Sequence, residues 1–325
     1  MITRRSGLGL LGAALLAVAC EPAPSSGPTS SAASSPGAAR PLVIASFYPL
    51  FEFARQVAGD RAEVVVLVPA GVEPHEWEPS PQDVARLQRA RLVVHNGAGF
   101  EPWVQKLQPE IQAKGAVLVD ASQGLPLLAR PRPAAPELGR GGWRARAAGA
   151  DLDPHVWLDP VLAQAQVETI RAALAAGEAS GAAAYAERAR AFTARLAALD
   201  AAFRAGLRDC ARRDLFTSHA AFGYLANRYG LRQVALLGLA PDQEPSPADL
   251  AAITRLARRD KAQAIFFETL VSPRLAETLA REIGARALPL NPLEGLTRDE
   301  LAAGKGYVTV MEENLASLRA GLGCR

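Results

Sequence analysis

The sequence predicts an α/β protein of two lobes, each built on a parallel sheet, joined by a long rigid linking helix with a cleft between the lobes. Two observations lead to this fold class. Short runs rich in β-branched or aromatic residues alternate with helical segments in both halves of the chain. Between the halves, residues 182–207 contain no Pro, and no Gly except Gly206. At 1.5 Å per residue this stretch would form about 39 Å of helix, enough to run the length of a small domain.

Length and charge narrow the class of protein further. A chain of 325 residues is long enough for two domains. Its 36 basic and 33 acidic residues leave a net charge of +3, and two of the positive charges, Arg4 and Arg5, lie in a segment that we expect to be removed. With so small a basic surplus and no basic run, the sequence predicts no nucleic-acid partner.

The N-terminus resembles an export signal. Arg4 and Arg5 precede an apolar run, residues 7–19, which is shorter than the roughly 20 residues that span a bilayer as a helix. Small residues lie just before Cys20, so we expect residues 1–19 to be a signal peptide and Cys20 to carry the lipid of a lipoprotein. A plain secretory signal is the alternative, and the paired arginines leave Sec and twin-arginine export both open.

The segment after Cys20 fits an anchored protein. Residues 20–40 are rich in Pro, Ser, Gly and Ala, with little apolar bulk to bury, and are expected to form a flexible tether. This leaves Cys210 and Cys324 in an oxidising compartment, where we expect them to form a disulfide.

The first lobe is expected over residues 41–160. Its predicted strands and helices alternate, and a Ser-Pro-x-Asp pattern at Ser80 marks the start of one helix. The predicted strands are 41–45, 64–68 and 92–94, and the other predicted helices are 50–59 and 103–113.

The second lobe is expected over residues 209–325, after linking helices at 161–208. Glu244–Pro247 repeats the letters of Glu78–Pro81, and a helix and an apolar strand follow each copy, which indicates a two-lobe internal repeat. The predicted strands are 215–217, 233–236, 264–267 and 288–290, and the predicted helices include 220–229 and 307–322.

Three of the four histidines suggest a metal site. His75, His155 and His219 lie in loops or at strand ends on both sides of the expected cleft. Neutral imidazole is a favoured zinc ligand, and the acidic neighbours Asp153 and Asp159 could orient the rings. His95 also ends a strand, but no flanking motif sets it apart, and we interpret it as structural.

Several motifs together resemble one family, the zinc-type solute-binding lipoproteins of metal ABC transporters (cluster A-I). They occur in order from about Pro41 to the C-terminus: Gly71 with Pro74-His75 and Glu78-Pro79-Ser80-Pro81; Asn96-Gly97 with Phe100-Glu101 and Trp103; Asp153-Pro154-His155-Val156-Trp157-Leu158-Asp159-Pro160; Thr217-Ser218-His219-Ala220-Ala221-Phe222-Gly223-Tyr224; Leu290-Asn291-Pro292-Leu293-Glu294-Gly295-Leu296; and Met311-Glu312-Glu313-Asn314-Leu315.

The resemblance implies a function in metal uptake. A protein of this kind is not an enzyme. It is a monomer, lipid-anchored on the outer face of the cytoplasmic membrane or periplasmic, and it holds one metal ion between its lobes. It delivers that ion to an ABC permease driven by a cytoplasmic ATPase. Carried over by motif, the ligands are His75, His155, His219 and Glu294, and the ion is zinc.

Two features qualify the resemblance. Glu268 also follows an apolar strand of the second lobe and competes with Glu294 as fourth ligand, although it could instead interact with the backbone amides near Ser272-Pro273. The loop 129–149 is rich in Pro, Gly and Arg and has no histidine, whereas many zinc-specific relatives carry a His- and acid-rich loop there.

Other functions stay open at this stage. Three imidazoles and one carboxylate favour four-coordinate zinc, but a glutamate that binds through both oxygens would admit manganese or iron. A zinc-dependent hydrolase would also use three protein ligands, although the sequence has no His-Glu-x-x-His motif. An adhesin-like surface lipoprotein that retains the metal site is a third, non-enzymatic alternative.

Overall fold

The computed structural model describes residues 40–129, 152–239 and 246–325. The expected signal peptide, the lipid-bearing Cys20 and the tether up to Ala39 lie outside these residues, as does almost all of the loop 129–149. Within the described residues, no helix is both long and apolar enough to cross a membrane.

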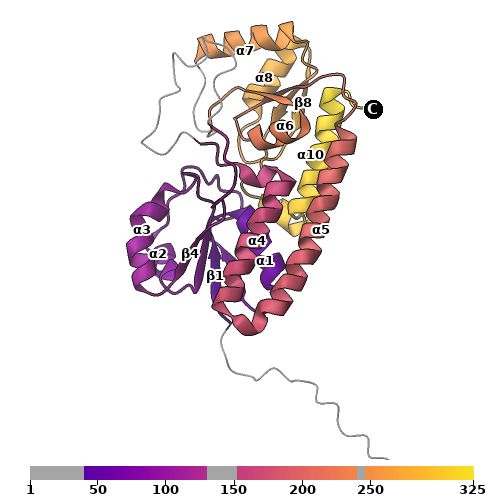
Figure 1. Cartoon of the computed structure of the whole chain (residues 1–325). Helices are drawn as coiled ribbons and strands as arrows, with labels where there is room; N and C mark the ends of the chain where they lie inside the picture. The colour runs from indigo at the N-terminus through magenta and orange to yellow at the C-terminus, as the bar shows by residue number, and fades with distance from the viewer. Residues whose placement is uncertain (1–39, 130–151, 240–245) are drawn as a thin grey trace, which may run out of the picture. The chain divides into compact units, whose positions relative to one another are not determined.

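The first lobe contains a four-stranded parallel sheet (Figure 1). Its strands lie in the order β2-β1-β3-β4, and apolar residues on both faces of the central strands β1 and β3 are buried, as expected of a parallel sheet covered by helices. The elements are β1 (Leu42–Ala45), α1 (Tyr48–Ala58), β2 (Glu63–Val66), α2 (Pro81–Leu87), β3 (Leu92–His95), α3 (Pro102–Ala113) and β4 (Val117–Asp120).

The second lobe repeats this topology. Its parallel strands lie in the order β6-β5-β7-β8, the same arrangement as in the first lobe. The elements are β5 (Asp214–Thr217), α6 (Gly223–Tyr229), β6 (Arg232–Ala235), α7 (Pro247–Arg259), β7 (Ala264–Phe267), α8 (Arg274–Ile283) and β8 (Arg286–Pro289), followed by α9 (Arg298–Ala302) and α10 (Tyr307–Leu322).

The repeated helix start occupies equivalent places in the two lobes. Ser80 accepts a hydrogen bond from the backbone N–H of Asp83 at the start of α2, and Ser246 does the same with Asp249 at the start of α7. Helix α2 connects the edge strand β2 to β3, which lies on the other side of β1. In the same way, α7 connects the edge strand β6 to β7, which lies on the other side of β5. The motif therefore marks a structural repeat.

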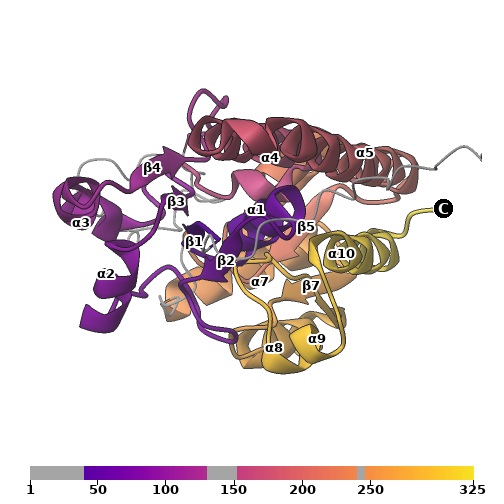
Figure 2. The same cartoon turned by 90° about the horizontal axis from the view of Figure 1, so that it is seen from below.

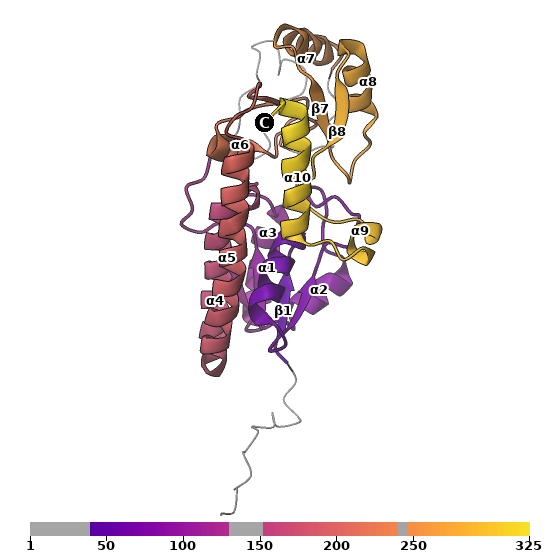
Figure 3. The same cartoon turned by 90° about the vertical axis from the view of Figure 1, so that its right-hand side faces the viewer.

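The two lobes are connected by a helical hairpin (Figure 3). After the short helix η1 (Val156–Leu158), α4 (Pro160–Gly177) and α5 (Ala182–Gly206) pack along each other, with the turn η2 (Ala179–Gly181) between them. The sequence predicted the break between Gly177 and Gly181 but not the reversal of the chain there. In Figure 2, α4 and α5 lie on one side of the molecule. Figure 1 shows α10 beside α5.

One hydrophobic core extends through both lobes. It includes Phe53 of α1, Phe203 of α5, Leu215 of β5 and Tyr307 of α10, each fully or almost fully buried. Because side chains of both lobes and of the hairpin pack in the same cluster, the lobes are held together by burial of apolar surface as well as by the connecting chain.

Several local predictions were inaccurate. Strand β4 was not predicted, β2 ends at Val66 instead of residue 68, and α6 begins at Gly223 instead of residue 220. The last difference lengthens the loop between β5 and α6 that carries His219.

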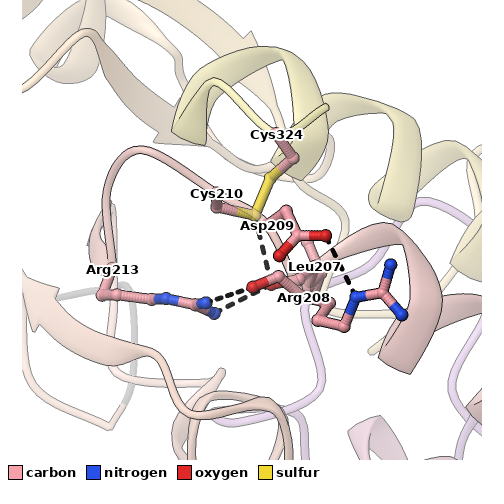
Figure 4. Close-up of a disulfide and its surroundings, with 6 residues drawn as sticks. All are labelled: Leu207, Arg208, Asp209, Cys210, Arg213 and Cys324. Atoms are coloured by element: carbon pink, nitrogen blue, oxygen red, sulfur yellow. Dashed lines mark hydrogen bonds and ion pairs between the residues drawn. A yellow bond between two sulfur atoms is a disulfide. The ribbon is translucent and has the colours of Figure 1, made fainter.

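Cys210 and Cys324 are joined by a disulfide that closes a loop of 114 residues in the sequence (Figure 4). The Arg213 guanidinium donates to the carbonyl oxygens of Leu207 and Arg208, next to the bridge. The disulfide ties the end of α10 to the chain that enters β5.

Candidate metal centre

Four side chains from both lobes meet at the lobe junction. His75 lies between β2 and α2 and His155 directly before η1, whereas His219 follows β5 and Glu294 follows β8. Two of them therefore follow carboxyl ends of parallel strands, where ligands of α/β proteins commonly bind. Within the part of the chain that the structure describes, these four form the one group of His, Cys, Asp or Glu residues able to hold a metal ion, with one ligand atom from each lying within 4.8 Å of the others.

A single oxygen atom lies at the centre of this group. Oε1 of Glu294 is 3.2 Å from Nε2 of His75, 3.2 Å from Nε2 of His155 and 3.1 Å from Nε2 of His219. The Nε2 atoms of His75 and His155 are 3.3 Å apart. All three imidazole rings thus direct their Nε2 atoms toward Oε1 of Glu294.

These separations match the edges of a tetrahedral zinc site. Ligand atoms placed 2.0–2.1 Å from a tetrahedral ion are about 3.3–3.4 Å apart. The four measured separations lie within a few tenths of an ångström of that value. Four of the six edges of such a tetrahedron therefore have the spacing that a small four-coordinate cation requires, and all four ligand atoms lie within 4.8 Å of one another.

The four side chains are buried, so the expected open cleft is closed around them. The side chains of His155 and His219 are fully buried, that of Glu294 is 2% exposed, and that of His75 is 8% exposed. Burial opposes ionisation of Glu294, but the interaction of its carboxylate with the nearby imidazoles, that of His219 above all, holds the pKa of this carboxyl well below the usual range. Burial lowers the pKa of His75, so that its imidazole favours the neutral, metal-binding form.

Asp153 orients His155. Its Oδ1 lies 2.7 Å from Nδ1 of His155 and accepts the backbone N–H of the same residue at 3.0 Å. This leaves Nε2 free to face the other ligands. A side chain at Gly223 would meet Oδ2 of Asp153 at 2.5 Å, so glycine is needed where the carboxylate approaches α6. Asp159, the other expected partner, instead caps α4 and pairs with Arg228.

Glu268 lies in a comparable place beside His219, where it forms an ion-pair contact with the ring and a hydrogen bond with the backbone. Its Oε1 lies 2.7 Å from Nδ1 of His219 and accepts the backbone N–H at 3.1 Å. The alternative that Glu268 interacts with backbone amides near Ser272-Pro273 is not what the structure shows, because its carboxylate accepts the backbone N–H of His219 after β5. Glu268 supports a histidine of the cluster, and Glu294 lies among the three imidazoles.

His75 is held differently from the other two histidines. Its backbone N–H donates to the carboxylate of Glu73 at 3.1 Å, and its ring packs edge-on against Phe100 at 4.8 Å. Burial and the nearby Glu294 carboxylate raise the pKa of Glu73 to about 8. As the most exposed member of the cluster, His75 marks the side nearest to solvent.

Comparison with known proteins agrees with this arrangement. The sequence profile of the ZnuA family, described as the periplasmic component A of the zinc-uptake complex, matches residues 43–321. The chain belongs to the ZnuA family.

Two named relatives and one solved structure are similar to this chain. The high-affinity zinc uptake system protein ZnuA of Bacillus subtilis is 38% identical over 322 residues, which is 99% of each chain. The zinc-binding lipoprotein AdcA of Streptococcus pneumoniae is 41% identical over 277 residues, 85% of this chain, and this chain spans only 55% of that protein. The Zn(II)-bound ZnuA-like domain of S. pneumoniae AdcA superposes with a TM-score of 0.74 at 40% identity, covering 87% of this chain and 99% of that domain.

Membership of the ZnuA family decides between classes of function. The family supplies a binding component of zinc uptake and not an enzyme, which overturns the hydrolase alternative.

His95 lies outside the ligand cluster, paired in register with Asp120 of β4. The sequence analysis did not predict that Glu268 would contact His219. The contact follows from the parallel pairing of β5 with β7, which brings the residues after the two strands together.

Proposed function

We propose that this protein captures a zinc ion outside the cytoplasm with His75, His155, His219 and Glu294 and delivers it to an ABC permease. A cytoplasmic ATPase would drive the transport step. The observation that carries the proposal is the convergence of three imidazole nitrogens on one oxygen of Glu294, at 3.1–3.2 Å. Membership of the zinc-uptake family and the named activities of the relatives support the same conclusion.

The donor set favours zinc over manganese. Three neutral imidazoles suit zinc, whereas manganese prefers more carboxylate ligands and a higher coordination number. All three imidazole contacts of Glu294 go to its Oε1 atom, an arrangement that supports binding through one oxygen. Asp153 and Glu268, which lie behind His155 and His219, add the negative charge that balances a dication.

The proposal includes an anchor and a division of the chain. Residues 1–19 would be the signal peptide and 20–40 a tether attached to membrane lipid through Cys20. Residues 41–160 and 209–325 would be the two metal-binding lobes, with linking helices at 161–208, and the protein would act as a monomer. Cys20 followed by a Pro- and Ser-rich segment supports the anchor.

Metal analysis of the purified protein tests the function. Protein purified without chelators should contain about one zinc ion per chain, and stripped protein should bind zinc more tightly than manganese in competition titrations. Zinc should also raise the melting temperature, because a ligand that binds only the folded state stabilises it. Tighter binding of manganese would refute the zinc assignment, and binding of neither ion would refute the proposed function.

A further inference from the structure

Trp157 lies directly against one of the proposed ligands. It belongs to η1, two residues after His155, and its side chain is fully buried. The centroid of its ring is 5.2 Å from that of His155, and the same ring packs edge-on against Phe47 at 4.7 Å and Phe100 at 5.2 Å. Two aromatic side chains of the first lobe therefore hold the indole against the His155 imidazole.

The polar groups of Trp157 bond to the second lobe. Its indole N–H donates to the carbonyl oxygen of Pro292 at 2.7 Å, and its own carbonyl oxygen accepts the hydroxyl of Tyr307. Pro292 lies two residues before Glu294. One side chain thus contacts the ring of one proposed ligand and the backbone beside another.

The segment that carries Glu294 is fixed at three consecutive residues. Asn314 of α10 accepts the backbone N–H of Asn291 at 2.8 Å and donates to its carbonyl oxygen at 2.7 Å. The side chain of Asn291 accepts the N–H of Leu293 at 2.7 Å, and Trp157 binds the carbonyl oxygen of Pro292. Leu293 has a φ of +59°, a left-handed conformation that is costly for leucine and persists only where surrounding contacts enforce it.

We propose that Trp157 is a positioning residue that holds His155 and Glu294 at their ligand spacing before the metal arrives. This inference rests on the proposed zinc function and extends it. Two of the four ligands, one from each side of the lobe junction, are positioned in advance by the hydrogen bond from the Trp157 indole to Pro292, which does not involve the metal. Zinc then does not have to order these two ligands on binding, which preserves affinity.

Trp157→Phe tests this role, because it keeps an aromatic ring but removes the N–H donor. Zinc affinity should fall about tenfold to a hundredfold, as for lost partners of metal ligands. Co²⁺-substituted protein should also show a changed visible spectrum, since that spectrum reports ligand geometry. The matched control is Trp103→Phe, another buried tryptophan, which packs against Trp77 at 6.0 Å. The control should keep the zinc affinity and the Co²⁺ spectrum of the unchanged protein.

The outcomes separate this inference from the proposed function. If the unchanged protein binds no zinc, the proposed function fails. If the unchanged protein binds zinc and folded Trp157→Phe binds it equally well with the same Co²⁺ spectrum, only the positioning role is refuted. A variant that merely loses stability would show a lower melting temperature with unchanged zinc affinity, which also counts against the role.

A measurement on the unchanged protein avoids any folding defect of the variant. The chain has four tryptophans, and their indole N–H signals in a nitrogen-15 spectrum can be assigned by replacing Trp77, Trp103 and Trp143 in turn. The Trp157 signal should exchange slowly with solvent in metal-free as well as zinc-bound protein. Rapid exchange that slows only after zinc is added would show that the metal creates the arrangement, and would overturn the inference.

Discussion

Oε1 of Glu268 lies 2.7 Å from Nδ1 of His219 and also accepts the backbone N–H of that residue at 3.1 Å. One carboxylate oxygen therefore lies against the ring of a proposed ligand and accepts its main-chain N–H. A carboxylate in this position fixes the ring orientation and makes the opposite nitrogen a stronger donor.

Glu268→Gln should weaken zinc binding about tenfold to a hundredfold, because the ring loses its charged partner but the ligand itself remains. Glu294→Gln should weaken it more, since it removes the anionic oxygen at the centre of the cluster. Competition with a chromophoric chelator measures both. Glu282→Gln is the matched control: it changes an exposed glutamate of the same lobe that lies 3.9 Å from Arg258 and should leave affinity unchanged. If Glu268→Gln loses more affinity than Glu294→Gln while both remain folded, the roles assigned to the two glutamates are reversed.

Zinc binding should release protons and weaken as pH falls. Burial opposes a charge on His219, but the carboxylates of Glu268 and Glu294 outweigh it and raise the pKa of the imidazole well above its usual value. Below that raised pKa the metal-free site holds a proton that zinc must displace, because only neutral imidazole is a ligand. Calorimetry in buffers of different ionisation enthalpy should therefore give different apparent binding enthalpies. Identical enthalpies at pH 7 would contradict the prediction.

Cys210 and Cys324 should contain no free thiol in unreduced protein. In a version of the chain that begins at Glu21, thiol titration after denaturation should count zero, and a count of two would refute the bridge. For the loop of 114 residues the chain-entropy model gives a stabilisation of about 4–5 kcal/mol, an upper value. The double change to serine should lower the melting temperature and leave zinc affinity nearly unchanged, since Cys210 precedes β5 whereas His219 follows it.

Cys20→Ser should release the protein from membranes into the soluble fraction, because lipid attachment requires the thiol of Cys20. Cell fractionation followed by immunoblotting measures the distribution. The double change of Cys210 and Cys324 to serine serves as the control and should stay with the membranes. Unchanged membrane association of Cys20→Ser would exclude the anchor.

Local patterns in the sequence predicted the two lobes, because alternating strands and helices and the repeated start at Ser80 and Ser246 are encoded by neighbouring residues. Strand β4 was not predicted, although residues 117–119 form a short apolar run. It lies at the edge of the sheet, where Val117 is 51% exposed. The chain reversal between α4 and α5 depends on how the apolar residues of these helices pack with those of α1. Such packing between distant segments cannot be predicted from a short sequence pattern.

The proposed ligands were predictable because each lies in a loop or at a strand end within a motif of the family. The partners of these ligands were predictable only where they are neighbours in sequence, as Asp153 is of His155. Glu268 is 49 residues from His219, and Trp157 reaches a carbonyl oxygen 135 residues away. Those contacts arise from the pairing of strands and from the lobe junction, so they required the structure.

The X-ray absorption spectrum of the zinc-loaded protein at the zinc edge tests the central claim most directly, because it reports the type and distance of the atoms bound to the ion. Our account predicts four nitrogen or oxygen ligands at about 2.0–2.1 Å, with the outer-shell scattering of three imidazoles. This imidazole scattering should weaken in His219→Ala. A sulfur ligand, a six-coordinate shell or fewer than three imidazoles would contradict the site formed by His75, His155, His219 and Glu294.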